Sequence, residues 1–332
     1  MLNPLLPVLL AVSAIRPASA IPPSTTHPID ANNPTQTPNL NAIDPRFNGH
    51  VAIQGRQILD LDSGLMALTK MLHRLSSSDY NSAIGPTAYT ASGYTSVSIE
   101  VRGVPGPRRD IPVKYAIWGA SRVGEYILHW QEVRNHVFAL TWERTVVGYM
   151  EFKRTPNPLS RVPGSDSKGQ IGDVDSILNA QLPRTDITSQ NLDEKNITLS
   201  LPLLDDDREM TLQYRVLNDH PMTKWELFAN IYAILALIGQ FPPRQRTTDS
   251  WMATSVIFPG TYYFFTPIAG SSGVEFRYIA DAAMSTAYFI LRRELFFSVL
   301  VRVLLDKNAI GQGLIGKGDL PHPTLPAGSL RG

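Results

Sequence analysis

Three side chains of the types used in nucleophilic catalysis recur at a spacing of four: Ser121, Glu125 and His129. Residues four apart lie on one face of an α-helix, so a hydroxyl, a carboxylate and an imidazole would be neighbours there. A hydrolase, however, holds its nucleophile on an exposed, strained turn rather than on a regular helix face. We therefore expect His129 to lie near a helix C-terminus, where the helix dipole favours a cation, and we assign no catalytic residue.

The small residues around Ser121 do not restore a catalytic interpretation. Residues 119–124 read G-A-S-R-V-G, which has one residue too many for the Gly-x-Ser-x-Gly nucleophile elbow. The segment also lacks the Lys-Ser/Thr end of a phosphate-binding loop. Glycine lowers helix propensity by ~1 kcal/mol, so we interpret Gly119 and Gly124 as positions where another element packs closely.

Carboxylates offer two further candidate chemistries. Glu100, Glu143 and Glu151 lie on predicted strands, and a pair of them facing one cleft could hydrolyse a glycosidic bond. Such residues usually occupy solvent-facing strand positions, and the sequence alone does not place these three. The acidic segment 205–207, followed by Glu209, lacks the glycine bend and the distal ligand of a calcium loop, so we interpret it as the tip of a hairpin.

Composition excludes several other chemistries. The chain has no cysteine, which rules out thiolate nucleophiles, disulfides, iron–sulfur clusters and cysteine-type zinc sites. The seven histidines show no metal-binding spacing. The formal net charge is +1, from 30 basic and 29 acidic residues, which argues against a dedicated nucleic-acid-binding protein. We predict no metal, no cofactor and no nucleic-acid partner, and other partners stay unknown.

The elements that must position these residues alternate between helix and strand. Leucines at 61, 65, 68, 72 and 75 fall at spacings of four and three, which predicts a helix over 58–75. The same reasoning predicts helices over 113–130, 225–241 and 279–291 and strands over 97–101, 138–142, 146–152, 197–204, 210–217, 262–265, 297–303 and 310–315. The apolar helix over 225–241 is too short and polar to span a bilayer, so we expect it in the core.

Two blocks, 49–154 and 196–317, share one order of elements: strand, helix, strand, helix and hairpin. Residues 50–154 can be placed on 213–317 without a gap, with equivalent positions 163 apart, as for Tyr115 and Tyr278. We predict an α+β fold in which helices pack on antiparallel sheet, and an internal duplication of one structural unit. The alternative is that two unrelated halves share the order by chance.

Segments of the first block resemble uncharacterised secretory proteins of filamentous fungi. The segments are 115–119 (YAIWG), 138–142 (FALTW) and 147–149 (VGY). Those fungal proteins combine a Trp-Gly helix with a hairpin that ends in Val-Gly-Tyr. The resemblance implies a secretory protein and brings no activity with it, so no functional residue is carried over.

The N-terminus predicts entry into the secretory pathway. An apolar run over 5–15 is followed by Ala18-Ser19-Ala20, the small-x-small spacing at which signal peptidase cleaves. We predict a signal peptide over 1–20 with cleavage after Ala20, although no Lys or Arg precedes the run. A disordered apolar N-terminus and an uncleaved membrane anchor are the alternatives. Once the signal is removed, we expect no transmembrane helix.

Asn196-Ile197-Thr198 is the one Asn-x-Ser/Thr triplet whose middle residue is not proline, so we predict a glycan on Asn196. It follows a polar linker over 155–195, which is alternatively a processing site or a functional flap. A disordered leader over 21–48 and a disordered tail over 318–332 are rich in proline and lack periodicity.

No catalytic, metal-binding or phosphate-binding motif was found, and this determines the class of function that we expect. We expect a secreted or cell-surface protein with a non-catalytic binding or structural role, and the alternative is a secreted hydrolase whose active site is scattered over several elements. Five aromatic residues are expected in the core or, alternatively, at an interface: Trp118, Trp142, Tyr149, Tyr262 and Tyr263.

Overall fold

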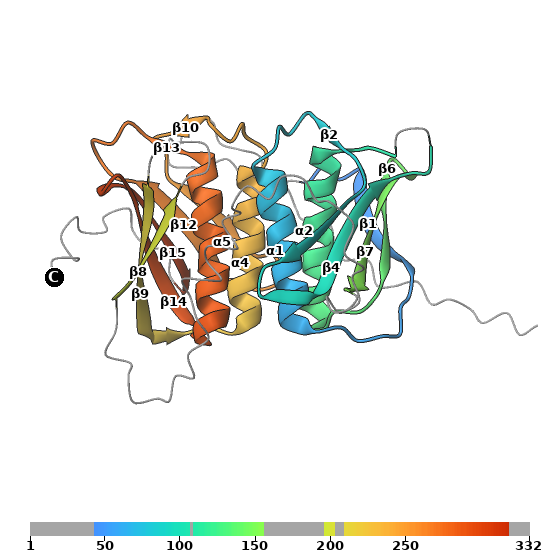
Figure 1. Cartoon of the computed structure of the whole chain (residues 1–332), viewed down its shortest axis with the longest axis horizontal. Coiled ribbons are helices and arrows are strands. Elements are labelled where there is room, and N and C mark those ends of the chain that lie inside the picture. The colour runs from blue at the N-terminus through green and yellow to red at the C-terminus, as the bar shows by residue number, and fades with distance from the viewer. Residues whose placement is uncertain (1–42, 107–108, 156–195, 203–208, 319–332) are drawn as a thin grey trace, which may run out of the picture. The chain divides into compact units, whose positions relative to one another are not determined.

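The computed structural model describes residues 43–106, 109–155, 196–202 and 209–318. In each half of this part, helices cover one face of an antiparallel sheet (Figure 1). The predicted α+β class, with helices packed on antiparallel sheet, is confirmed. The predicted signal peptide and almost all of the leader and linker lie outside the described residues, as do the acidic segment 205–207 and the tail from 319.

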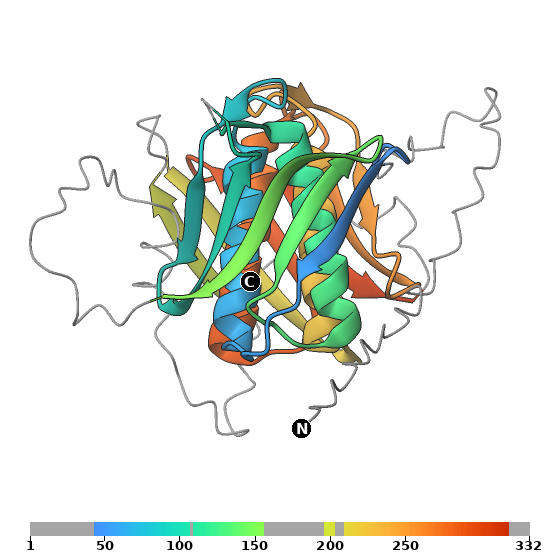
Figure 2. The same cartoon turned by 90° about the vertical axis from the view of Figure 1, so that its right-hand side faces the viewer.

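The first half has its sheet on one side of two helices (Figure 2). Its elements are β1 (Phe47–Ile53), α1 (Leu61–Ser76), β2 (Ala83–Ile84), β3 (Thr87–Ala91), β4 (Tyr94–Gly103), β5 (Ile111–Pro112), α2 (Val113–Trp130), β6 (Val137–Trp142) and β7 (Thr145–Arg154). The strand order in the sheet is β1-β6-β7-β4-β3, so β1 and β3 are its edges.

The second half follows the same plan. Its elements are β8 (Asn196–Pro202), β9 (Glu209–Pro221), α4 (Lys224–Ile238), β10 (Arg246–Thr247), β11 (Trp251–Thr254), β12 (Thr261–Pro267), β13 (Val274–Glu275), α5 (Phe276–Arg293), β14 (Phe297–Leu305) and β15 (Asn308–Lys317). The strand order is β11-β12-β15-β14-β9-β8. If β9, β14, β15, β12 and β11 are equated with β1, β6, β7, β4 and β3, both sheets have one order, and β8 is an addition.

Element bounds strengthen this correspondence. α5, β15, β13 and β10 begin and end 163 positions after α2, β7, β5 and β2. The hairpin turns also match, because Glu143 and Arg144 have positive φ, as do Asp306 and Lys307. The two halves therefore share a topology, while descent from one duplicated unit stays a prediction.

Local sequence explains where the helices begin and end. Asp60 caps α1, because its carboxylate accepts a hydrogen bond from the Ser63 N–H (2.8 Å). A capping box between Thr223 and Glu226 begins α4. This helix ends at Ile238, before the predicted 241.

The predicted leader over 21–48 is wrong at its C-terminal end. Strand β1 begins at Phe47, which pairs with Trp142 of β6. The Phe47 ring is buried against Tyr115 and Trp118 of α2, with centroids 5.8 and 5.4 Å apart. This packing stabilises a strand whose polar sequence shows no clear alternation.

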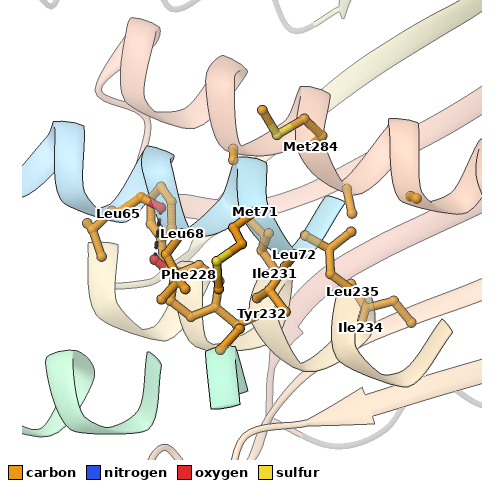
Figure 3. Packing of buried hydrophobic residues seen from close by; sticks show 14 of the residues in the cluster. Leu65, Leu68, Met71, Leu72, Phe228, Ile231, Tyr232, Ile234, Leu235 and Met284 are labelled. Atoms are coloured by element: carbon orange, nitrogen blue, oxygen red, sulfur yellow. Dashed lines mark hydrogen bonds between the residues drawn. The ribbon is translucent and has the colours of Figure 1, made fainter. Parts of the chain in front are cut away.

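One apolar core joins the two halves. Helix α1 packs against α4 and α5, and α2 packs against α4, so the helices lie between the two sheets (Figure 1). Figure 3 shows Leu65 and Leu68 of α1 beside Phe228 and Tyr232 of α4, and the Tyr232 hydroxyl donates a hydrogen bond to the Leu65 carbonyl (3.0 Å). The predicted core position of the helix over 225–241 is confirmed. Among the described helices, none has the length and apolar character needed to cross a bilayer.

Candidate functional site

Ser121, Glu125 and His129 lie on α2 but do not assemble a catalytic relay. The Ser121 hydroxyl donates a hydrogen bond to a main-chain carbonyl one turn earlier (3.1 Å), and Glu125 accepts one from Arg122 (2.8 Å). His129 lies in the last turn of the helix, as predicted, and contacts the edge of Trp130. Each side chain therefore has a different neighbour.

The two glycines of α2 allow close packing, as predicted. A Cβ atom on Gly119 would lie 2.6 Å from Cδ1 of Leu140 on β6. On Gly124 it would lie 2.9 Å from the Tyr232 ring of α4. Gly119 therefore brings α2 close to its own sheet, and Gly124 brings it close to the other half.

Of the three predicted strand carboxylates, Glu100 and Glu151 lie side by side, whereas Glu143 lies apart from them. Glu100 and Glu151 pair across β4 and β7 on the face of the sheet opposite the helices, and Lys153 forms an ion pair with both. Glu143 lies at the β6–β7 turn, where it accepts a hydrogen bond from Arg46 (2.9 Å). These carboxylates neutralise nearby cations instead of flanking a substrate.

Two histidines have buried polar partners. His73 Nε2 lies 2.8 Å from Asp281 Oδ1, and this contact joins α1 to α5. His136 Nδ1 accepts a hydrogen bond from the Gly55 N–H (2.8 Å), and its Nε2 lies 3.2 Å from the Tyr126 hydroxyl. Burial lowers the pKa of His136. Both rings are almost inaccessible to solvent, so we assign them structural roles.

The remaining predicted residues lie in separate places. Trp118, Tyr262 and Tyr263 are buried, whereas Trp142 and Tyr149 are half-buried. Asn196 begins β8, the edge strand of the second sheet. Within the described ranges, no three His, Asp or Glu residues gather where they could hold a metal ion.

The candidate site is a groove of about 480 Å³ between the C-terminal half of α1 and strand β3. Its volume falls in the range of small-ligand sites, ~300–1,000 Å³. Helix α1 contributes two cations, the two residues that follow the helix contribute hydroxyls, and β3 contributes four successive residues. The described lining residues, none of them acidic, are Lys70, Arg74, Ser77, Ser78, Thr87, Ala88, Tyr89 and Thr90.

The helix wall is polar. Lys70 and Arg74 are four residues apart and lie on one side of α1, and Ser77 and Ser78 directly follow the end of this helix at Ser76. The Ser77 and Ser78 hydroxyls donate hydrogen bonds to main-chain carbonyls one turn earlier (3.0 and 2.9 Å). Since each hydroxyl has one proton, these oxygens can only accept a further hydrogen bond from a ligand.

The strand wall carries an aromatic hydroxyl close to the cations. Burial raises the pKa of Tyr89, and the Arg74 charge acts in the opposite direction. Tyr89 is therefore a neutral hydrogen-bond donor at physiological pH. The groove combines positive charge, one phenol and small hydroxyls.

The equivalent corner of the second half is filled instead of open. Phe241, Trp251 and Phe276 are in mutual ring contact there, with centroids 4.7, 5.0 and 5.2 Å apart. Phe276 opens α5 as Val113 opens α2. The same scaffold is thus closed by aromatic packing in one half and open in the other.

Strand pairing identifies the residue that replaces Trp251. In the first sheet, Thr87 pairs with Val101, and Val101 pairs with Met150. In the second sheet, Trp251 pairs with Phe265, and Phe265 pairs with Gly313. Met150 and Gly313 are 163 positions apart, so they are equivalent, and Thr87 occupies the place of Trp251.

Three further differences distinguish the two corners at the offset of 163. A polar or charged residue of the first half stands where the second half has an apolar one: Lys70 and Ala233, Arg74 and Leu237, Ser78 and Phe241. Ser78 leaves the space that Phe241 fills in the second half, and Lys70 and Arg74 make the groove positive. Sequence reasoning missed these residues, although a comparison of the two blocks position by position contains this signal.

Comparisons with known proteins do not identify the chain. No family model matches it, and no curated protein does. A solved structure described as a conserved protein of unknown function with a hot dog fold, from Alicyclobacillus acidocaldarius, covers 85% of this chain and 96% of its own at 13% identity. Its TM-score of 0.14 is too low to carry an argument about fold or function. The resemblance to fungal secretory proteins stays a prediction.

Proposed function

We propose that this chain is a secreted or cell-surface binding protein without catalytic activity, and that the groove between α1 and β3 holds an anionic ligand. The observation that carries the proposal is the difference between the two corners. Phe241 and Trp251 fill the corner of the second half, so the fold does not require an opening there. The first half has Ser78 and Thr87 instead, and the opening they leave is lined by cations.

Electrostatics favours an anion in this groove. Lys70, which is only 5% exposed, and Arg74 are one helical turn apart on the same wall, and no carboxylate is among the described lining residues. Two unit charges 4 Å apart attract by ~4 kcal/mol at an effective dielectric constant of about 20. Both cations already take part in an interaction in the folded chain, so a ligand carboxylate would exchange for it. Binding should therefore weaken as salt is added.

The groove's chemistry supports binding rather than turnover. Its described lining consists of cations, hydroxyls and one alanine, without an imidazole or carboxylate that could act as a general base. The Ser77 and Ser78 hydroxyls donate to main-chain carbonyls, whereas a nucleophilic serine would donate to a base.

The test replaces two groove residues by the large aromatic residues found at the equivalent positions of the second half. Calorimetric titration of the chain with phosphate, citrate and a blocked acidic peptide should detect binding of at least one of them. The double variant Ser78→Phe/Thr87→Trp should weaken that binding at least tenfold, as should Arg74→Ala. The control Arg56→Ala removes an exposed cation from another loop and should leave it unchanged. No binding of any anion, or equal binding by the filled variant, would overturn the proposal.

The secretory part of the proposal needs its own measurement. The chain expressed in a eukaryotic secretory host should reach the medium starting at Ile21, and its intact mass should include a glycan that Asn196→Gln removes. A product that keeps Met1, stays inside the cell and carries no glycan would contradict this part alone.

A further inference from the structure

We infer that the groove binds an extended acidic segment of a partner protein, which adds as a strand to the edge of β3 and places two carboxylates, two residues apart, against Lys70 and Arg74. This inference rests on the proposed function, because it names the class of anion that the groove takes. It is carried by the form of the groove and by the spacing of its cations.

The groove runs along the edge of the strand. Thr87, Ala88, Tyr89 and Thr90 line it in succession. Side chains of a strand alternate between its two faces, so a groove on one face would touch every second residue. Four successive lining residues mean that the groove follows the main chain. Because β3 is the last strand of its sheet in the part of the chain that the structure describes, half of its N–H and C=O groups point away from β4.

The two walls have matching lengths. From Thr87 to Thr90 the strand advances by roughly 10 Å, and from Lys70 to Ser76, the last residue of α1, the helix rises by roughly 9 Å. A segment of four or five extended residues would therefore contact both walls. A free sheet edge beside a helix is the arrangement in which peptides bind by strand addition, with main-chain hydrogen bonds for affinity and side-chain contacts for specificity.

The distance between Lys70 and Arg74 determines how far apart the two acidic residues of the ligand should be. Lys70 and Arg74 are four residues apart on α1, a rise of roughly 6 Å. Residues two apart in a strand lie on the same side, roughly 6.6 Å from each other. An acidic-x-acidic segment can therefore direct both carboxylates to the helix wall. Two adjacent acidic residues would point to opposite sides, and only one would reach a cation.

Local features leave room for such a strand. Ala88 is an exposed residue with a single methyl group, so it does not crowd the edge. The Ser77 and Ser78 oxygens can accept hydrogen bonds from a ligand. Pairing between β3 and β4 shifts register between Tyr89 and Ala91, which limits the regular edge to the part that lines the groove. In the second half, Trp251 occupies the corresponding corner and closes it.

The experiment measures binding of labelled, terminally blocked peptides to the full chain by fluorescence anisotropy. The peptide T-V-E-V-E-V-T should bind, while T-V-Q-V-Q-V-T and T-V-V-E-E-V-T should bind at least tenfold more weakly. Two N-methylated versions of the first peptide carry the methyl groups on odd or on even residues. One should lose at least tenfold and the other little, since only alternate N–H groups face a neighbouring strand. Arg74→Ala should weaken binding, and Arg56→Ala should not.

The outcomes separate this inference from the proposed function. If both N-methylated peptides bind as well as their parent, or if citrate binds and no peptide does, strand addition is overturned while the anion-binding groove stands. If no anion binds, both fail. A further variant replaces residues 156–195 by a glycine-serine linker of equal length. If the peptide binds only to this variant, the groove is normally occupied by the chain's own segment, and the inference of a separate partner protein is overturned.

Discussion

His73 and Asp281 link the halves through one buried contact. Their side chains lie 2.8 Å apart, and each residue is less than a tenth exposed. Another polar link between the halves, from Lys224 to Asp62, is 2.7 Å long but has side chains 25% and 38% exposed. Water competes with the second contact and not with the first, so equal distances should give unequal contributions to stability.

Asp281→Ala should lower the free energy of unfolding by about 3 kcal/mol, because it leaves His73 buried without its partner. Asp62→Ala is the matched control and should cost less than about 1 kcal/mol. Urea titrations at constant slope measure both values. Equal decreases in the free energy of unfolding would contradict the idea that burial decides how much each contact contributes to stability.

His136 makes stability depend on pH. Burial, and next the Arg134 charge, hold its pKa below the ordinary value of 6.5, whereas Glu132 acts in the opposite direction. The folded chain therefore binds this proton less readily than the unfolded chain. The resulting stability is fully present above the ordinary pKa and is lost as pH falls through the folded-state value.

His136→Gln should reduce the loss of stability between about pH 7.5 and about pH 5, because the variant lacks this titrating group. His50→Gln changes an exposed histidine and serves as control. Urea midpoints at the two pH values give the comparison. An unchanged pH dependence in His136→Gln would show that other groups dominate it.

Among the elements, the β6–β7 and β14–β15 hairpins carry the clearest conformational cost. Both central residues of the turns β6–β7 and β14–β15 have positive φ, 48° and 70° at Glu143 and Arg144 and 50° and 66° at Asp306 and Lys307. Two such residues in succession make the turn that matches the twist of paired strands. Residues with a Cβ atom pay ~1–2 kcal/mol for this conformation, which glycine avoids.

Arg144→Gly should therefore raise the free energy of unfolding by about 0.5–1 kcal/mol, after the greater freedom of glycine in the unfolded chain is subtracted. Thr145→Gly, at the first residue of β7, should lower it, because Thr145 has no positive φ to relieve and glycine loses more backbone freedom on folding. Thermal melts of the two variants measure the opposite signs. A destabilised Arg144→Gly would show that its side chain outweighs the strain.

The whole molecule folds around contacts between helices of different halves. Helix α4 is buried on most of its surface and contacts α1, α2 and α5. Separating the halves would expose apolar faces that amount to much of the core. We therefore interpret the two halves as one cooperative unit despite their shared topology.

The chain should unfold in one transition, with far-UV circular dichroism and tryptophan fluorescence giving the same midpoint. A fragment of residues 43–155 should not form a cooperatively folded monomer, because the faces of α1 and α2 that contact α4 would be exposed to water. Two separated transitions in the full chain would contradict this expectation.

Sequence by itself determined the long elements. The bounds of α2 follow the predicted 113–130, and the leucine spacing of α1 and the alternation along β14 also predict the observed type. Helix face and strand alternation are local patterns with periods of a few residues, so a long element repeats its own signal. The shared order of the two blocks is the sum of such local signals.

Tertiary structure decided the short strands, the contact between halves and the candidate groove. Strands β3 and β11 are too short to repeat a pattern, and their position depends on pairing with β4 and β12. Strand pairing makes Thr87 the equivalent of Trp251, although the two are 164 positions apart (251 − 87), one more than the offset elsewhere. A groove formed by residues from separate elements exists only once hydrogen bonding has set their register, and no single segment encodes that.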